Sequence, residues 1–363
     1  MGVSRYESNL MKKLESIHQI DRIIADEIRS IIQEQKEFLK DEVQKKKLLS
    51  FSDILTYLLE RYRKILKEYT LRGKQSVYQE EDINRYIRKL IPALKNIFKY
   101  YSEGRLIEAG KKIDLLFKIK ANKISAQAYF PKYTIKKDTI WFRARILPEG
   151  KKRLTREDLF HVPNNLRHKV KTNRYTIPGF PCLYLSNSLT CANNEIGMPA
   201  VSIVNCFKNM KSFEVFDFSF FSSSTTPLIY QIMSYPIKIA ASIPVINKEE
   251  KYFVEEYVMS QIILHSTIMQ KGSFNKVYGI LYSSVNLFEN EINKEHFAFN
   301  QNLVVPPKWI APPQMYSSFL GSLFHSTEPK VFPFAYMNNK EIEILGNIMS
   351  EENFAEIDLY KSC

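Results

Sequence analysis

The first third of the chain repeats apolar residues at steps of three and four positions. The clearest stripe comprises Leu14, Ile17, Ile20, Ile24, Ile28 and Ile31. Similar stripes follow in residues 55–69 and 83–97, and a shorter apolar segment occupies residues 104–118. Residues three and four positions apart lie on one face of an α-helix, so the pattern predicts amphipathic helices. We therefore expect residues 1–125 to form an all-α bundle of three to five helices.

Two residues refine the expected helix ends. Ser52 precedes the second stripe and is a suitable N-cap, because its hydroxyl can accept a hydrogen bond from a free backbone N–H. Pro92 lies inside the third stripe, where a proline removes a backbone donor. We expect a kink or a helix boundary at that position.

From about residue 125 the helical periodicity gives way to short aromatic and β-branched runs, which favour strands. The strand candidates are residues 124–135, 139–147, 211–221, 235–246 and 275–284. Residues 249–273 instead predict a helix, in which acidic positions alternate with the apolar residues Phe253, Tyr257, Ile262 and Ile263. Together with the helical first part, this mixture predicts an α+β fold.

The stretch around which the second part is organised is residues 174–197, which predicts a turn, a strand, a loop and a helix. It opens with the turn residues Pro178, Gly179 and Pro181. An apolar run at residues 183–185 has strand character, and cap-type residues 186–188 precede a helical segment. Glu195 lies near the end of that helix, eleven positions after Tyr184 (195 − 184 = 11), with few other charges nearby. A carboxylate there is either a surface residue or part of a site.

Length and composition narrow the class of protein. With 45% hydrophobic and 25% charged residues, the chain is globular and not largely disordered. Its 363 residues exceed the size at which a single core usually stops growing. We therefore expect two domains, a helical regulatory or partner-binding domain at residues 1–125 and a catalytic domain at residues 126–363.

The chain is strongly basic, with a net charge of +13 and a pI of about 9.3. Such a charge suits nucleic acid, an anionic membrane or an anionic small molecule, and it equally fits a lysine-rich genome. Glutamates interleave with the lysines of the first helix, which favours a solvated face over a nucleic-acid surface. Charge alone does not exclude nucleic acid as a partner.

The cysteines and the apolar runs bear on the cellular compartment. Cys182 and Cys191 are close enough in sequence to pair, but the four cysteines lack metal-type CxxC spacing and fit buried, reduced thiols better. The N-terminus shows no secretory signal pattern, and no apolar run approaches the roughly 18 residues of a membrane span. We expect a soluble, cytoplasmic protein without a membrane partner.

Four features of the second part carry candidate chemistry. Arg143 lies in an expected strand, where a guanidinium on an apolar background either binds an anion or points to water. Arg174 lies before the central turn, and Tyr184 with Glu195 is the third feature. The fourth is a strand end with the hydroxyl residues Tyr282, Ser283 and Ser284. Hydroxyl residues at a strand end are often only turn formers, and none of the four features identifies a site by itself.

In combination, these motifs resemble the RES domain family, which is named for an Arg, a Glu and a Ser. The matching residues are Trp141, Phe142, Arg143, Arg174, Tyr175, Tyr184, Leu185, Ser188, Glu195, Gln261, Gly279, Ile280, Tyr282, Ser284, Asn302, Leu303 and Val304. The resemblance covers roughly residues 138–310 and depends on the order and spacing of five short motifs. Ser260 stands where the family pattern has a proline, which affects a helix start and not the site.

RES domains are similar to ADP-ribosyltransferase folds and to toxins that consume NAD⁺. The resemblance therefore implies a mixed β-sheet domain of that type, with NAD⁺ as substrate and no metal. It implies that Glu195 stabilises the oxocarbenium-like ribose and that Arg143 binds the pyrophosphate. Ser284 is the third expected catalytic residue and would hold a ribose hydroxyl or the amide.

The resemblance also implies a wider set of substrate contacts. Tyr184 would stack on nicotinamide or line the pocket, and Arg174 would be a second phosphate contact. The expected binding residues are thus Arg143, Arg174, Tyr184, Tyr282 and Ser284. Water, phosphate or a protein side chain can each accept the sugar, and the sequence leaves these acceptors open.

An enzyme that destroys NAD⁺ has to be restrained in its own cell. The resemblance therefore implies a toxin of a toxin–antitoxin or anti-phage defence system, whose antitoxin or regulator contacts the N-terminal helices. A homo-oligomer that occludes the pocket is a further form of restraint. The alternatives from other classes are a nucleic-acid-binding protein and a non-catalytic scaffold with the same fold.

Overall fold

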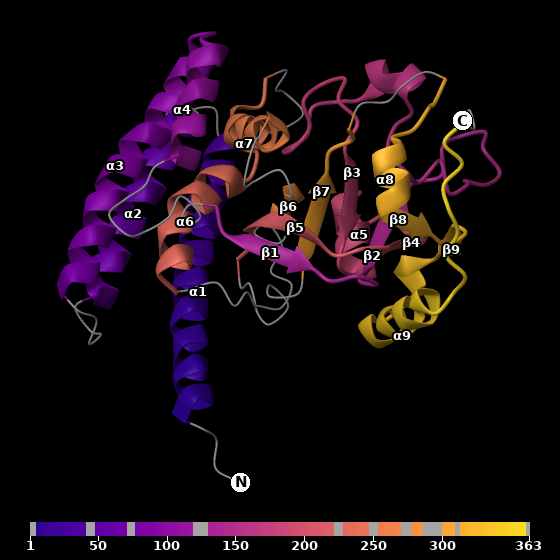
Figure 1. Ribbon diagram of the computed structural model, residues 1–363, viewed down its shortest axis with the longest axis horizontal. Helices are drawn as coiled ribbons and strands as arrows, with labels where there is room; N and C mark the ends of the chain where they lie inside the picture. The colour runs from indigo at the N-terminus through magenta and orange to yellow at the C-terminus, as the bar shows by residue number, and fades with distance from the viewer. Residues whose placement is uncertain are drawn as a thin grey trace. The chain divides into compact units, whose positions relative to one another are not determined.

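A computed structural model describes residues 5–40, 48–70, 77–118, 130–220, 228–246, 253–269, 277–285, 300–308 and 313–360 (Figure 1). The chain begins with helices and continues with a nine-stranded sheet and interspersed helices, so the predicted α+β class is confirmed. The helices are α1 (Arg5–Leu39), α2 (Phe51–Thr70), α3 (Val77–Ser102), α4 (Leu106–Lys118), α5 (Leu189–Glu195), α6 (Leu228–Ser242), α7 (Val258–Met269), α8 (Ser318–Leu323) and α9 (Asn339–Ser350). The strands are β1 (Lys132–Ile135), β2 (Ile140–Arg145), β3 (Leu183–Ser186), β4 (Ser202–Asn209), β5 (Phe213–Phe218), β6 (Val277–Ser283), β7 (Gln301–Val305), β8 (Phe324–Ser326) and β9 (Lys330–Phe332).

The described residues fall into two compact units. The first contains the residues up to Lys132 together with Asp217–Ser266, so it combines α1 to α4 with α6 and most of α7. The second contains Tyr133–Phe216 and the described residues from Thr267 onward. These units are defined by compactness alone. The division into a regulatory domain at 1–125 and a catalytic domain at 126–363 concerns function and stays a prediction.

In the first unit, α6 packs among α1, α2 and α3 (Figure 1). Its Tyr235 hydroxyl donates to the carboxylate of Asp21 on α1 at 2.7 Å, and both residues are almost fully buried. The Tyr62 hydroxyl of α2 donates to the main-chain oxygen of Ile232 at 2.6 Å. Buried polar groups are tolerated when they are hydrogen-bonded, so these contacts fix α6 within the bundle.

The structure corrects the strand predicted at residues 235–246. Residues up to Ser242 belong to α6, whose described side chains, from Gln231 on, are buried on every side. A helix that is apolar all round shows no 3.6-residue period, so its Ile-rich sequence cannot be told from a buried strand by periodicity. Of the strand predicted at 124–135, β1 takes only Lys132–Ile135, and residues 119–129 lie outside the described part.

The helix-end predictions also change. Ser50, not Ser52, caps α2, because the Ser50 hydroxyl accepts from the Asp53 N–H at 3.2 Å while the Asp53 carboxylate accepts from the Ser50 N–H at 3.3 Å. Pro92 does not end α3, which continues to Ser102. Of the helix predicted at 249–273, α7 takes Val258–Met269 after a short 3₁₀ turn at Glu255–Tyr257, and residues 249–252 and 270–273 lie outside the described part.

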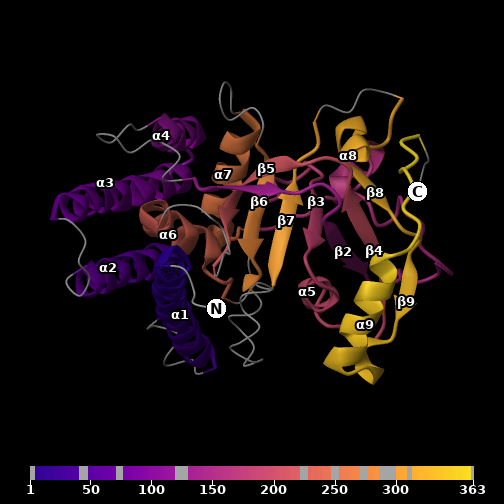
Figure 2. The same cartoon turned by 60° about the horizontal axis from the view of Figure 1, so that its bottom comes forward.

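The sheet has the strand order β1-β5-β6-β7-β3-β2-β4-β8, with β9 also paired to β4. Strand β2 pairs with β4 over six residue pairs but with β3 only at Phe142 and Ser186. Alternate residues of β2 enter different cores: Trp141 packs on the face that holds Leu320 and Leu323 of α8, and Phe142 packs on the face covered by α5 and α9 (Figure 2). This alternation decides which side of the sheet each candidate residue faces.

Candidate functional site

The predicted order of turn, strand, loop and helix is confirmed around Glu195. Strand β3 covers Leu183–Ser186, and the Ser188 hydroxyl caps α5 by accepting from the Cys191 N–H at 3.1 Å. Glu195 is the last residue of α5. Gly197 follows with a φ of +87°, a left-handed conformation that ends helices and suits glycine. The local sequence therefore places one carboxylate at the end of a short, capped helix.

The Glu195 carboxylate is held by two donors from distant parts of the chain. The Ser284 hydroxyl, just after β6, donates to Oε1, and the Asn302 Nδ2 of β7 donates to the same oxygen at 2.7 Å. Hydrogen bonds to an ionised acceptor are stronger than those between neutral groups. The structure thus brings together Glu195 and Ser284, two of the three residues predicted to be catalytic.

Asn302 is itself fixed by its neighbours. It lies directly opposite Ser186 in the β3–β7 register, and the Ser186 hydroxyl donates to its Oδ1 at 2.6 Å. The Cys191 thiol also approaches Oδ1, at 3.5 Å. Burial raises the pKa of Cys191, and the nearby Glu195 carboxylate raises it further, so the thiol keeps its proton. The sequence motif contained Asn302 but gave no sign of this contact with Glu195.

Tyr282, which is close enough to Glu195 to feel its charge, belongs to a group of three tyrosines with Tyr175 and Tyr184. The rings of Tyr175 and Tyr282 lie 4.7 Å apart, and the Tyr184 hydroxyl lies 2.5 Å from the hydroxyl of Thr176. Burial raises the pKa of Tyr282, the Glu195 charge raises it further, and the Arg174 charge lowers it. Glu195 and Arg174 thus both lie within electrostatic reach of one buried phenol, which stays neutral near pH 7.

Arg143 lies differently from the other candidates. In the β2–β4 register it follows the side of the sheet of Trp141 and not that of Phe142, against which α5 packs. Its Nη1 donates to the main-chain oxygen of Tyr184 at 2.6 Å, across the gap where β2 and β3 no longer pair. Burial lowers its pKa to about 9, so it stays charged near neutral pH. Among the described residues, no hydrogen bond or ion pair joins it to Glu195.

Asn205 of β4, which pairs with Arg143 in the register, was missed by the sequence analysis. Its side chain is 0% exposed, and neither amide atom has a hydrogen-bond partner in the described part of the chain. The Nε of Arg143 and the Nε1 of Trp141 on the same side of the sheet are also buried without a partner there. Nothing in the spacing of the sequence distinguishes this asparagine from an ordinary strand residue.

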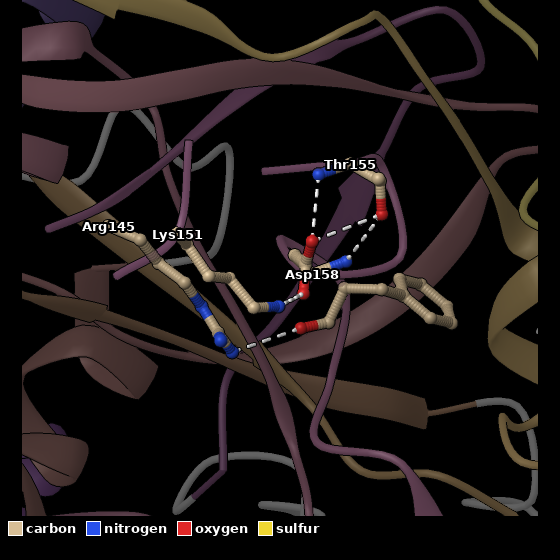
Figure 3. Close-up of polar contacts among 5 residues, drawn as sticks. Arg145, Lys151, Thr155 and Asp158 are labelled. Atoms are coloured by element: carbon tan, nitrogen blue, oxygen red, sulfur yellow. Dashed lines mark hydrogen bonds and ion pairs between the residues drawn. The ribbon is translucent and has the colours of Figure 1, made fainter. Parts of the chain in front are cut away.

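The loop after β2 is fixed by polar contacts of its own (Figure 3). The Asp158 carboxylate accepts from Lys151 at 2.8 Å and from the Thr155 N–H at 2.9 Å, and Arg145 donates to the main-chain oxygen of Phe160 at 3.4 Å. His161 donates through Nδ1 to Val162 and accepts through Nε2 from the Ser317 N–H, so both ring nitrogens are used. Burial lowers the pKa of His161 to about 4.

The predicted state of the cysteines is confirmed for Cys182, Cys191 and Cys206, which are buried, free thiols. Cys363 lies outside the described residues. Across the described ranges, none of the helices combines the length and the apolar character that crossing a bilayer requires.

Comparison with known proteins gives one informative match. No family model matches the chain, and no solved structure matches it. The chain is 26% identical over 195 residues to a curated protein of Bacillus subtilis (strain 168) named "Putative toxin YopC". The match covers 48% of this chain and 42% of the relative, so the chain spans less than half of the relative's length. This is a distant similarity to a protein described as a toxin.

Proposed function

We propose that this chain is an NAD⁺-consuming enzyme that breaks the bond between nicotinamide and ribose. The observation that carries the proposal is the Glu195 carboxylate, which Ser284 and Asn302 hold beside the buried rings of Tyr282 and Tyr175. The resemblance to RES domains and the distant similarity to a protein named as a toxin support the same conclusion.

The chemistry of NAD⁺ suits a site with one carboxylate. Nicotinamide leaves as a neutral molecule, so its departure needs no general acid. The ribose is left with a positive charge, and a negative group held in advance next to it lowers the barrier. Glu195 is an exposed carboxylate at this place, and the partly exposed Tyr184 offers a flat ring on which nicotinamide would stack, whereas Tyr175 and Tyr282 are buried.

The two arginines are the proposed phosphate contacts. Arg174 is 6% exposed, and its charge lowers the pKa of Tyr282, which the Glu195 charge raises, so both charged groups lie near the same buried ring. Arg143 stands next to Tyr184 at the gap between β2 and β3, and its buried Nε has no partner in the described part of the chain. Its guanidinium lies on the side of the sheet opposite α5 and Glu195, so a phosphate oxygen would have to enter the gap between β2 and β3 to complete its hydrogen bonding. Tyr184 and Ser284 complete the proposed binding residues.

The proposed biological role is that of a cytoplasmic toxin in a toxin–antitoxin or anti-phage defence system. Water or phosphate is the favoured acceptor, and transfer of ADP-ribose to a protein is the alternative. An antitoxin or regulator contacting the N-terminal helices would restrain the enzyme. Because α6 packs against α1, α2 and α3, removal of residues 1–120 would uncover buried residues such as Tyr235. The partner is therefore better tested with the full chain.

The proposal is tested by incubating the full-length protein with NAD⁺, with and without phosphate, and identifying the products. We expect the wild type to release nicotinamide and Glu195→Gln to release almost none. Glu343→Gln on α9 is the matched control, because this exposed glutamate has no contact with the site. Nicotinamide release that is equal in wild type and Glu195→Gln, or absent from both, would overturn the proposal.

A further inference from the structure

We infer that Asn302 is a positioning residue for Glu195, and that Ser186 sets the direction in which the Asn302 amide points. This inference rests on the proposed function for its catalytic meaning. Its structural part, that Asn302 holds the carboxylate, can be tested separately.

The direction of the Asn302 amide follows from its neighbours. Ser186 donates its hydroxyl proton to Oδ1 at 2.6 Å, and the Cys191 thiol donates to the same oxygen at 3.5 Å. With Oδ1 occupied by two donors, the Nδ2 group faces Glu195 and donates to its Oε1 at 2.7 Å. The reversed amide would set a carbonyl oxygen against a carboxylate oxygen, which is repulsive.

The two oxygens of the Glu195 carboxylate have different surroundings. Ser284 and Asn302 both donate to Oε1. Oε2 accepts no hydrogen bond from any described residue. One oxygen therefore anchors the side chain, and the other is left to face the substrate. This division assigns Ser284 a supporting role next to Asn302, in addition to its proposed contact with the ribose.

Burial shields the groups that hold Glu195. Asn302 is 2% exposed, Ser186 is 4% exposed and Ser284 is 1% exposed, and the bond from Ser186 to Asn302 is buried, whereas Glu195 is an exposed residue whose two hydrogen bonds are partly buried. Ser186 and Asn302 are also paired across β3 and β7, which fixes the separation of their backbones. In such surroundings a hydrogen bond is electrostatically stronger, and an unmade one is costly.

A purely structural role for Asn302 is the competing explanation, and α5 offers a matched control. Asn193 Oδ1 accepts from the Ser202 hydroxyl at 2.5 Å, a buried bond of the same kind as Ser186 to Asn302, but without a contact to Glu195. If Ser186 acts through Asn302 on Glu195, Ser186→Ala should slow the reaction and Ser202→Ala should not.

The kinetic test compares kcat and KM of the full chain with NAD⁺ as the probe. We expect Asn302→Ala to lower kcat about 10- to 100-fold and Ser186→Ala about 3- to 10-fold, with KM changed less than about threefold. Ser202→Ala should keep the wild-type kcat. An equal loss in Ser186→Ala and Ser202→Ala, or a loss confined to KM, would overturn the inference.

A double-mutant cycle in urea tests the contact without using activity. Asn302→Ala should lower the urea midpoint more in the presence of Glu195 than in a Glu195→Ala background, because only the first comparison removes the contact between the two. Equal shifts would overturn the positioning role, whatever the activity. Unequal shifts in a protein that leaves NAD⁺ intact would support the contact while refuting the proposed function, so the two failures are distinguishable.

Discussion

Shortening Glu195 by one methylene separates the position of the carboxylate from its charge. In Glu195→Asp the charge is kept, but the carboxylate withdraws by about one C–C bond, about 1.5 Å. The Asn302 Nδ2 to oxygen distance, 2.7 Å in the wild type, would then grow to about 4 Å, beyond hydrogen-bonding range. Glu195→Gln makes the opposite change, because it keeps the length and an acceptor oxygen and removes the charge.

The expected magnitudes of the two variants differ. A hydrogen bond to a charged group contributes about 1.5–3 kcal/mol, which corresponds to roughly 10- to 150-fold in kcat for Glu195→Asp. Loss of the charge about 4 Å from a cationic ribose removes about 4 kcal/mol at an effective dielectric constant of about 20, or about 10³-fold for Glu195→Gln. The reasoning therefore predicts that kcat decreases from the wild type to Glu195→Asp and further to Glu195→Gln.

The assay is nicotinamide release at saturating NAD⁺, with circular dichroism and urea unfolding to show that each variant is folded. A Glu195→Asp variant within threefold of the wild type would show that the anchored geometry is unimportant. A Glu195→Gln variant as active as Glu195→Asp would show that the negative charge does not act on the ribose. Either result would refute the reasoning given for this carboxylate.

Three further predictions concern stability and do not depend on the enzymatic activity. Burial holds the pKa of His161 at about 4, against an ordinary value of 6.5, so the unfolded chain takes up this proton first as the pH falls. Between pH 6.5 and pH 4 the free energy of unfolding should therefore drop by about 3 kcal/mol. Urea titrations should find this drop reduced in His161→Gln. Ser50→Ala removes the α2 cap and should lower the free energy of unfolding by about 1 kcal/mol in urea titrations, and a loss below about 0.3 kcal/mol would contradict the assigned cap. An added Cβ at Gly279 would overlap the main-chain oxygen of Val304, whereas one at Gly110 meets open space within α4. Gly279→Ala should therefore lower the thermal midpoint of unfolding, and Gly110→Ala should leave it unchanged or raise it. A lower midpoint for Gly110→Ala than for Gly279→Ala would contradict this.

The elements that the sequence predicted correctly are those whose signals are local. The stretch from Leu183 to Glu195 folds as expected for two local reasons. Its strand is short and apolar, and Ser188 caps the helix by a hydrogen bond to a residue only three positions further along the chain. Residues 235–242 of α6 were predicted wrongly because a helix buried on all sides has no polar face to reveal its period.

The candidate site was only partly predictable for a different reason. Ser284 and Asn302 reach Glu195 from 89 and 107 positions away in sequence, and no local pattern specifies that they share one carboxylate oxygen. The order of the sequence motifs predicted which residues belong to the site, but the strand register decides on which face of the sheet each residue lies. Arg143 illustrates this limit, since the register places it on the side of Trp141, and its link to the site passes through the backbone of Tyr184.

The central claim is that Glu195 acts on the ribose of NAD⁺, and the most direct measurement is the identification of products from NAD⁺ incubated with the full-length wild type and with Glu195→Gln. The account predicts free nicotinamide and an ADP-ribose product from the wild type, at a rate about 10³-fold above that of Glu195→Gln. Intact NAD⁺ after incubation with the wild type, or equal cleavage by both proteins, would contradict it.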